Sequence, residues 1–139
     1  MTAERPCDLR GLTILVVEDD EDCRDLLGHC LGLRGAQVLL ADCAAAALES
    51  LALQTPDVMV SDIAMPGEDG YTLMRRVRSS EHAQSQNILA IALTTYTREH
   101  DSLSAGFDLH LSKPLPPTRV AQAVRELAGA KLSRGPHRP

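Results

Sequence analysis

Charged residues follow three short apolar runs of this chain, at the point where each run ends. They are Glu18, Asp19 and Asp20 directly after the run 14–17, Asp62 one serine after the run 58–60, and Lys113 one serine after the partly apolar run 107–111. Strands of a parallel sheet are buried on both faces and read as such runs, and their carboxyl ends open into one crevice. Carboxylates that meet there repel each other unless a positive charge intervenes. The pattern therefore predicts a divalent metal held by carboxylates, with a lysine opposite and a reactive oxygen between them.

Short apolar runs alternate with helical patterns between residues 12 and 128. The expected strands are 12–17, 37–41, 57–61, 88–93 and 107–111. The expected helices are 21–34, 44–53, 71–79, 98–105 and 116–127, the last one stopping at Gly129. Five strands that alternate with five helices predict an α/β fold: a doubly wound parallel sheet with right-handed crossovers and helices on both faces.

The bulk composition fits one domain with an aliphatic core. The chain has 139 residues, of which 44% are apolar, with one Phe, two Tyr and no Trp. We expect residues 1–11 to form a polar lead-in, 12–128 the domain, and 129–139 a flexible basic tail. The net charge of −5 argues against direct binding of nucleic acid. Neither a signal peptide nor a membrane-length apolar run is visible, so we expect no membrane contact and a cytoplasmic location.

Each charged position also has an ordinary structural explanation. An acid after a strand often caps the next helix, and Asp20 or Glu21 suits that role. Asp62 at a strand end could likewise be a cap, and Lys113 on a surface would be solvated. The expected adjacency of the first and third strands favours a shared site instead, since it places Asp62 beside Asp19. A cis bond before Pro114 is one way to aim the lysine inward.

Other kinds of site find little support. The chain has no GxxxxGK[ST] or GxGxxG motif for binding a nucleotide. Its histidines lack the spacing of metal ligands, and its four cysteines form no CxxC pair. Thr94 and Thr95 offer hydroxyl donors after the fourth expected strand.

Four segments taken together resemble the receiver domain of two-component response regulators. They are 14–20 (ILVVEDD), 57–70 (DVMVSDIAMPGEDG), 92–94 (ALT) and Lys113-Pro114, in that order and spacing. The segment 105–114 (AGFDLHLSKP) particularly resembles receivers of hybrid histidine kinases and their stand-alone relatives. The resemblance covers about residues 12–128. It implies a flavodoxin-like (βα)5 fold with strand order 2-1-3-4-5.

The resemblance also implies a role for each matching residue. Asp62 would accept a phosphoryl group from a sensor histidine kinase or a histidine-phosphotransfer protein. Thr94 would be the switch hydroxyl, Lys113 would pair with a phosphoryl oxygen, and His110 holds the position of an aromatic rotamer switch. The expected ligands of Mg²⁺, or of Mn²⁺ in its place, are Asp19, Glu18 (often through a metal-bound water), Asp62 and the backbone carbonyl of Ala64.

The resulting hypothesis is a phosphoacceptor switch and not a turnover enzyme. Its chemistry is limited to self-phosphorylation and self-dephosphorylation. Residues 98–127 would form the surface read by a downstream protein target, with the chain a monomer or a weak homodimer. Ala64 cannot orient an attacking water and Tyr96 could cover the phosphoryl group, which predicts slow-to-moderate self-dephosphorylation.

Two alternatives stay open at this point. A receiver-fold adaptor could work without phosphorylation, and the unusual histidine at position 110 is the only hint of it. A Mg²⁺-dependent phosphohydrolase would need a general acid next to its nucleophile and a substrate cap. Position 64 is alanine, and the sequence has no insertion of the size of a cap.

Overall fold

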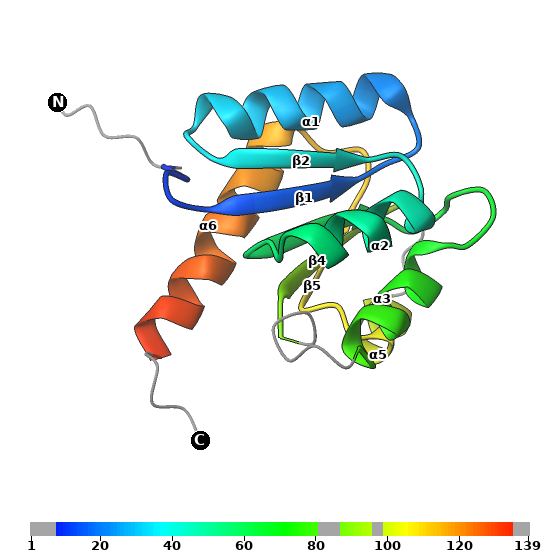
Figure 1. The fold of residues 1–139 in the computed structure, drawn as a ribbon. Helices are drawn as coiled ribbons and strands as arrows, with labels where there is room; N and C mark the ends of the chain where they lie inside the picture. The colour runs from blue at the N-terminus through cyan, green and yellow to red at the C-terminus, as the bar shows by residue number, and fades with distance from the viewer. Residues whose placement is uncertain (1–7, 81–86, 96–98, 135–139) are drawn as a thin grey trace, which may run out of the picture.

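A five-stranded parallel sheet forms the centre of the molecule (Figure 1). The structure is a computed structural model that describes residues 8–80, 87–95 and 99–134. The strands are β1 (Thr13–Val17), β2 (Gln37–Ala41), β3 (Val58–Asp62), β4 (Leu89–Thr94) and β5 (Leu109–Ser112). They lie in the order β2-β1-β3-β4-β5, and every neighbouring pair is parallel. The predicted doubly wound fold and its strand order are confirmed.

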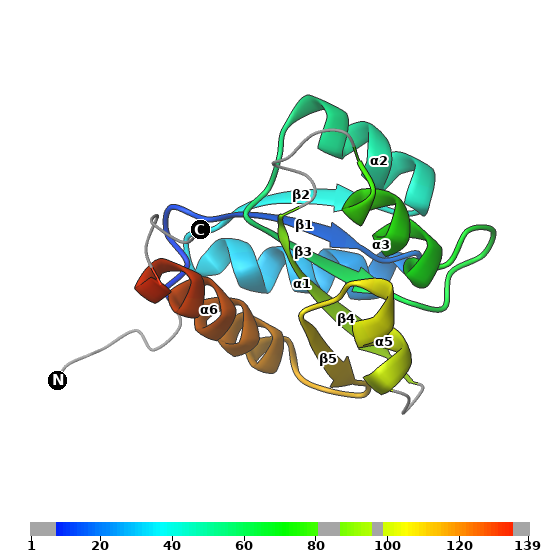
Figure 2. The same cartoon turned by 90° about the horizontal axis from the view of Figure 1, so that it is seen from below.

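Helices cover both faces of this sheet (Figures 1 and 2). They are α1 (Glu21–Leu33), α2 (Ala44–Leu53), α3 (Gly70–Arg78), α5 (Glu99–Ala105) and α6 (Pro117–Arg134). The helices α1 and α6 lie on one face, while α2, α3 and α5 lie on the other (Figure 2). The carboxyl ends of the strands therefore stay open between the two helical layers.

Alternating side chains of the strands fill the two halves of the core. In β1, Ile14 and Val16 face α1 and α6, while Leu15 and Val17 face the opposite helices. This alternation follows from the two-residue period of a strand, and it explains why the run is apolar throughout. Phe107 is the only aromatic side chain among the buried described residues, so the core is aliphatic as predicted.

Two predicted element boundaries are wrong by more than one residue. The last strand begins at Leu109, because Gly106 adopts a positive φ of 117° and the Phe107 N–H still bonds the Ser102 carbonyl, 3.1 Å away. The last helix does not stop at Gly129 but continues to Arg134. Gly129 does not adopt the positive φ that would end the helix there. A glycine inside a helix costs only about 1 kcal/mol relative to alanine.

The predicted terminal segments are described only in part. Leu9, inside the predicted polar lead-in, is fully buried, and its N–H donates to the Arg34 carbonyl 2.8 Å away. This contact joins the end of the lead-in to the core beside α1. Residues 1–7 and 135–139 lie outside the described residues.

Candidate functional site

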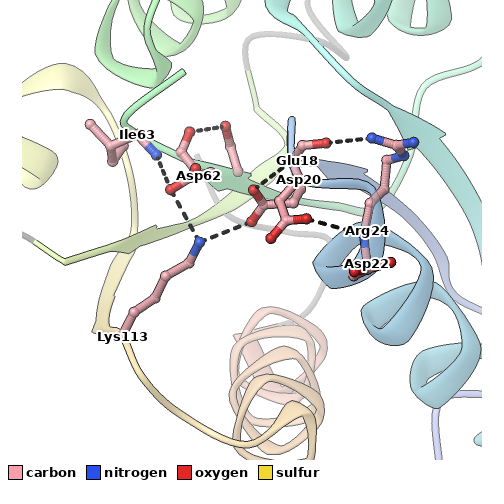
Figure 3. A network of polar contacts seen from close by, with 8 residues as sticks. Glu18, Asp20, Asp22, Arg24, Asp62, Ile63 and Lys113 are labelled. Atoms are coloured by element: carbon pink, nitrogen blue, oxygen red, sulfur yellow. Dashed lines mark hydrogen bonds and ion pairs between the residues drawn. The ribbon is translucent and has the colours of Figure 1, made fainter. Parts of the chain in front are cut away.

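The ends of three strands bring an acid, a second acid and a lysine together (Figure 3). Glu18 follows β1, Asp62 is the last residue of β3, and Lys113 follows β5. The Lys113 Nζ lies 2.9 Å from Glu18 Oε1 and 3.4 Å from Asp62 Oδ1. The order β1-β3-β4-β5 places these ends along one edge of the sheet. The predicted placement of the lysine opposite the acids is therefore confirmed, while the chemical role of each residue stays a prediction.

Asp19 completes a group of three carboxylates. One oxygen each from Glu18, Asp19 and Asp62 lies within 4.8 Å of the others. Glu18 and Asp62 are buried, whereas Asp19 is exposed and marks the side that opens to solvent. Three ionised carboxylates and one ammonium leave an excess of two negative charges. An all-oxygen donor set with this excess suits a hard divalent cation such as Mg²⁺.

Backbone contacts hold Glu18 in its buried position. The side chain accepts a hydrogen bond at Oε2 from the Asp20 N–H, 3.2 Å away. Its own backbone N–H donates to Ala41 at the end of β2, and its carbonyl accepts from Arg24 Nη1, both at 3.0 Å. These contacts come from β2 and α1, so the position of the carboxylate is set by the fold around it (Figure 3).

Asp20 has a different task from the two acids before it. Its carboxylate accepts a hydrogen bond from the Asp22 N–H, 3.1 Å away, at the first turn of α1. A side-chain acceptor at this position satisfies one of the unpaired N–H groups at a helix start. Of the two residues predicted as candidates for the cap, Asp20 and Glu21, Asp20 has that role.

Asp62 is held close to the backbone that follows it. Its Oδ1 accepts a hydrogen bond from the Ile63 N–H, 2.9 Å away, and the residue is only 6% exposed. Burial, together with the charge of Glu18, raises the pKa of the Asp62 carboxyl from 3.8 to about 6. Lys113 and the Ile63 N–H oppose that rise. Asp62 is thus a carboxylate whose negative charge is poorly compensated unless a cation is added.

Lys113 keeps its charge in spite of partial burial. Burial acts to lower the pKa of its ammonium, but the hydrogen bond to Glu18 and the charge of Asp62 outweigh burial and raise the pKa. The Lys113 backbone N–H donates to the Thr94 carbonyl, 2.8 Å away, and the bond to Pro114 is cis. The ammonium therefore serves as the cation of this site among the described residues.

The two predicted switch residues lie on one face of the sheet. Thr94 is the last residue of β4 and is fully buried. His110 pairs with Ala92 and Ser112 pairs with Thr94, so Thr94 and His110 project toward the same side as α5. His110 lies two residues before Ser112, the last residue of β5, so it is further from the open edge of the sheet and outside the acidic group. Tyr96 lies outside the described residues.

Three residues near the site were missed by sequence reasoning. Arg24 binds the Glu18 carbonyl, and Ser102 contacts the His110 ring with 2.8 Å between Oγ and Nδ1. At Gly70, a side chain would come within 2.5 Å of the Asp62 carbonyl oxygen. The glycine after Asp69 is visible in the sequence and could have indicated this close approach. The other two contacts depend on how helices dock, which no local pattern reveals.

Comparison with known proteins places these features in one family. A model of the response regulator receiver domain matches residues 14–125. An uncharacterized 14.6 kDa protein of Leptolyngbya boryana is 43% identical over 85% of this chain and 91% of its own length. Hybrid signal transduction histidine kinase D of Dictyostelium discoideum is 37% identical over 77% of this chain, a match that spans only 8% of that kinase.

Solved structures show the same relationship. The receiver domain of a signal transduction histidine kinase from Syntrophus aciditrophicus is 30% identical with a TM-score of 0.79, covering 93% of this chain and 98% of that domain. The chemotaxis response regulator CheY4 of Vibrio cholerae is 25% identical with a TM-score of 0.78, covering 84% of this chain and 98% of that protein. Within the described parts of the chain, none of the helices has the length and apolar character needed to cross a membrane.

Proposed function

This chain belongs to the response regulator receiver domain family, and from that premise we propose that it is a phosphorylation-driven signalling switch whose acceptor is Asp62. One observation carries the assignment: Asp62 is a buried carboxylate that lies 3.4 Å from the Lys113 ammonium and within the group of three acids. Glu18 shares this setting, but both of its oxygens have partners, Oε1 in Lys113 and Oε2 in the Asp20 N–H, whereas the contacts of Asp62 with Lys113 and the Ile63 N–H both fall on Oδ1.

The proposed reaction is transfer of a phosphoryl group from a phosphohistidine to Asp62. An oxygen of the Asp62 carboxylate attacks phosphorus, the P–N bond breaks, and the imidazole keeps the electron pair and takes up a proton from solvent. The product is an acyl phosphate, so this is nucleophilic catalysis by a carboxylate. Among the described residues, the hydrogen bond and the ion pair of Asp62 both fall on Oδ1. We assign the attack to Oδ2 for that reason.

Charge compensation is the main contribution of the surrounding residues. Lys113, already between Glu18 and Asp62, is placed to donate to an oxygen of the incoming phosphoryl group. Glu18, Asp19 and Asp62 would hold Mg²⁺, or Mn²⁺ in its place, with the Ala64 carbonyl as a further ligand. When bound, that ion neutralises charge on the phosphoryl oxygens. The chain itself supplies fixed position and a site that is partly closed to water.

The output follows from Thr94. The phosphoryl group adds a charge of roughly −1.5 to −2 and strong acceptor oxygens. The Thr94 hydroxyl would turn toward these oxygens from the end of β4, which changes the packing on the face that β4 and β5 share with α5. The surface formed by α5, β5 and α6 would then change its population of conformations and bind a downstream protein. The phosphodonor would be a histidine kinase or a histidine-phosphotransfer protein. The cytoplasmic location and a monomeric or weakly dimeric state stay predictions.

A direct test is phosphorylation by a small donor. The protein is incubated with Mg²⁺ and phosphoramidate or acetyl phosphate, and the intact chain is weighed. We expect one phosphoryl adduct, lost in Asp62→Asn and kept in Asp25→Asn, an exposed residue of α1 that has the same chemistry. Absence of an adduct with either donor would favour an adaptor that works without phosphorylation. Continuous release of phosphate from small esters would favour a hydrolase.

A further inference from the structure

The imidazole of His110 is fixed at one nitrogen only. Its Nδ1 lies 2.8 Å from the hydroxyl oxygen of Ser102, a residue of α5 that is fully buried. Its Nε2 is also buried and has no hydrogen-bond partner among the described residues. A histidine ring has polar groups at both nitrogens, so the ring in this position leaves one of them unsatisfied. A rotation that brings the ring to the surface would give that nitrogen access to water.

The helix that carries Ser102 has little apolar packing to hold it. Of the side chains described for α5, only Ser102 and Ala105 are buried, and Leu103 is 46% exposed. The backbone carbonyl of Ser102 also accepts from the Phe107 N–H at 3.1 Å, a contact that links the middle of α5 to the segment after its last residue. The hydrogen bond between Ser102 and His110 is therefore a specific side-chain contact that joins α5 to β5.

We propose that Ser102 is a positioning residue of the switch: its hydroxyl holds the His110 ring against α5 before any phosphorylation. The inference rests on the proposed function for its consequence, since it concerns the surface that Thr94 and His110 would control. A serine hydroxyl can donate to one ring tautomer and accept from the other, so it fixes the orientation of the ring in both. With Ser102 present, the His110 ring points inward in the unphosphorylated protein. Because the hydrogen bond joins α5 to β5, α5 moves with β5 when the packing on this face of the sheet changes.

Removal of the hydroxyl should release the ring. In Ser102→Ala, both nitrogens of the inward ring lack a partner, and we expect the outward population to rise by roughly fivefold or more. Ser104→Ala is the matched control, because Ser104 is on the same helix but exposed. The χ1 orientation of His110 is measured by three-bond NMR couplings and by contacts between the ring protons and α5, in the unphosphorylated protein.

A double-mutant cycle separates this role from a general effect on folding. Phosphorylation with phosphoramidate should change the amide chemical shifts of α5 and β5, and Ser102→Ala should alter the size of that change. In a His110→Phe background, Ser102→Ala should no longer alter it. If Ser102→Ala leaves the His110 couplings as they are in Ser104→Ala, or has the same effect in both backgrounds, the inference is wrong. Failure of the proposed function would look different: no phosphoryl adduct would form on the wild-type chain, while the couplings of His110 would still report its orientation.

Discussion

The charge imbalance at Asp62 leads to a prediction about stability: Asp62→Asn should stabilise the metal-free protein at neutral pH. Burial and the charge of Glu18 raise the pKa of this carboxyl from 3.8 to about 6. A raised pKa means that the folded state favours protonated Asp62. The stability due to that preference is present below pH 3.8 and is lost as the pH rises through about 6. Asparagine keeps the shape of the side chain and cannot ionise.

The size of the effect follows from the shift. Each pKa unit corresponds to about 1.4 kcal/mol, so the difference between the two states gives about 3 kcal/mol at most. The site opens to solvent on the side of Asp19, and screening there reduces the expected gain to about 1–2 kcal/mol. This figure already includes the loss of the contact between Asp62 and Lys113, because that contact lowers the pKa of Asp62 and is part of the value of about 6. For a chain of this size the gain raises Tm by about 3–8 °C.

The assay is equilibrium unfolding in urea at pH 4 and pH 7.5, followed by far-ultraviolet circular dichroism in the presence of a chelator. The control is Asp25→Asn, which removes the same charge from an exposed site on α1. We expect the free energy of unfolding of Asp62→Asn to exceed that of Asp25→Asn at pH 7.5 and to approach it at pH 4. Addition of Mg²⁺ should reduce the difference in stability between Asp62→Asn and the wild type, since the ion binds the folded wild type. Equal stability of the two variants at pH 7.5, or a difference that does not change with pH, would refute the reasoning.

Three further changes test other parts of the site. Gly70→Ala places a methyl group 2.5 Å from the Asp62 carbonyl oxygen and should cost about 1–3 kcal/mol in urea unfolding, whereas Gly32→Ala meets open space and should not. Lys113→Met leaves two buried acids without their cation and should cost about 2–3 kcal/mol at pH 7.5 without metal, less than for a fully buried pair because Lys113 is 23% exposed, and should also slow adduct formation. Ala64→Asn provides a side chain that can orient water and should shorten the lifetime of the adduct severalfold, measured by intact mass over time; an unchanged lifetime would contradict that role.

The outline of the fold was readable because the strands are buried on both faces. Runs such as 58–60 are apolar throughout, which predicts a parallel sheet, and the alternation with helices then limits the possible topologies. The boundaries of the elements are harder to predict, because each depends on the cost of a single residue. Gly129 reads as a helix stop, yet the helix passes through it, since the cost of about 1 kcal/mol is small beside the packing of α6 on the sheet.

The acidic group was predictable for the same reason as the sheet. Once β1, β3 and β5 are parallel, Glu18, Asp62 and Lys113 must leave the sheet at one edge, and opposite charges there attract. The contact between Ser102 and His110 could not be predicted in this way. It depends on the distance and angle at which α5 docks on β5, and a serine in a short polar helix carries no pattern that indicates burial.

The position of Lys113 connects the stability of the resting protein with the proposed reaction. In the unphosphorylated chain its ammonium is 2.9 Å from Glu18 and 3.4 Å from Asp62, so it offsets two buried negative charges at once. A phosphoryl group on Asp62 would bring a larger negative charge to the same ammonium. Lys113 cannot then compensate Glu18 to the same degree, and Glu18 must rely on a bound cation. Phosphorylation and metal binding should therefore favour each other. Phosphorylation weakens the contact between Lys113 and Glu18, and a bound cation compensates the charge of Glu18 in place of Lys113.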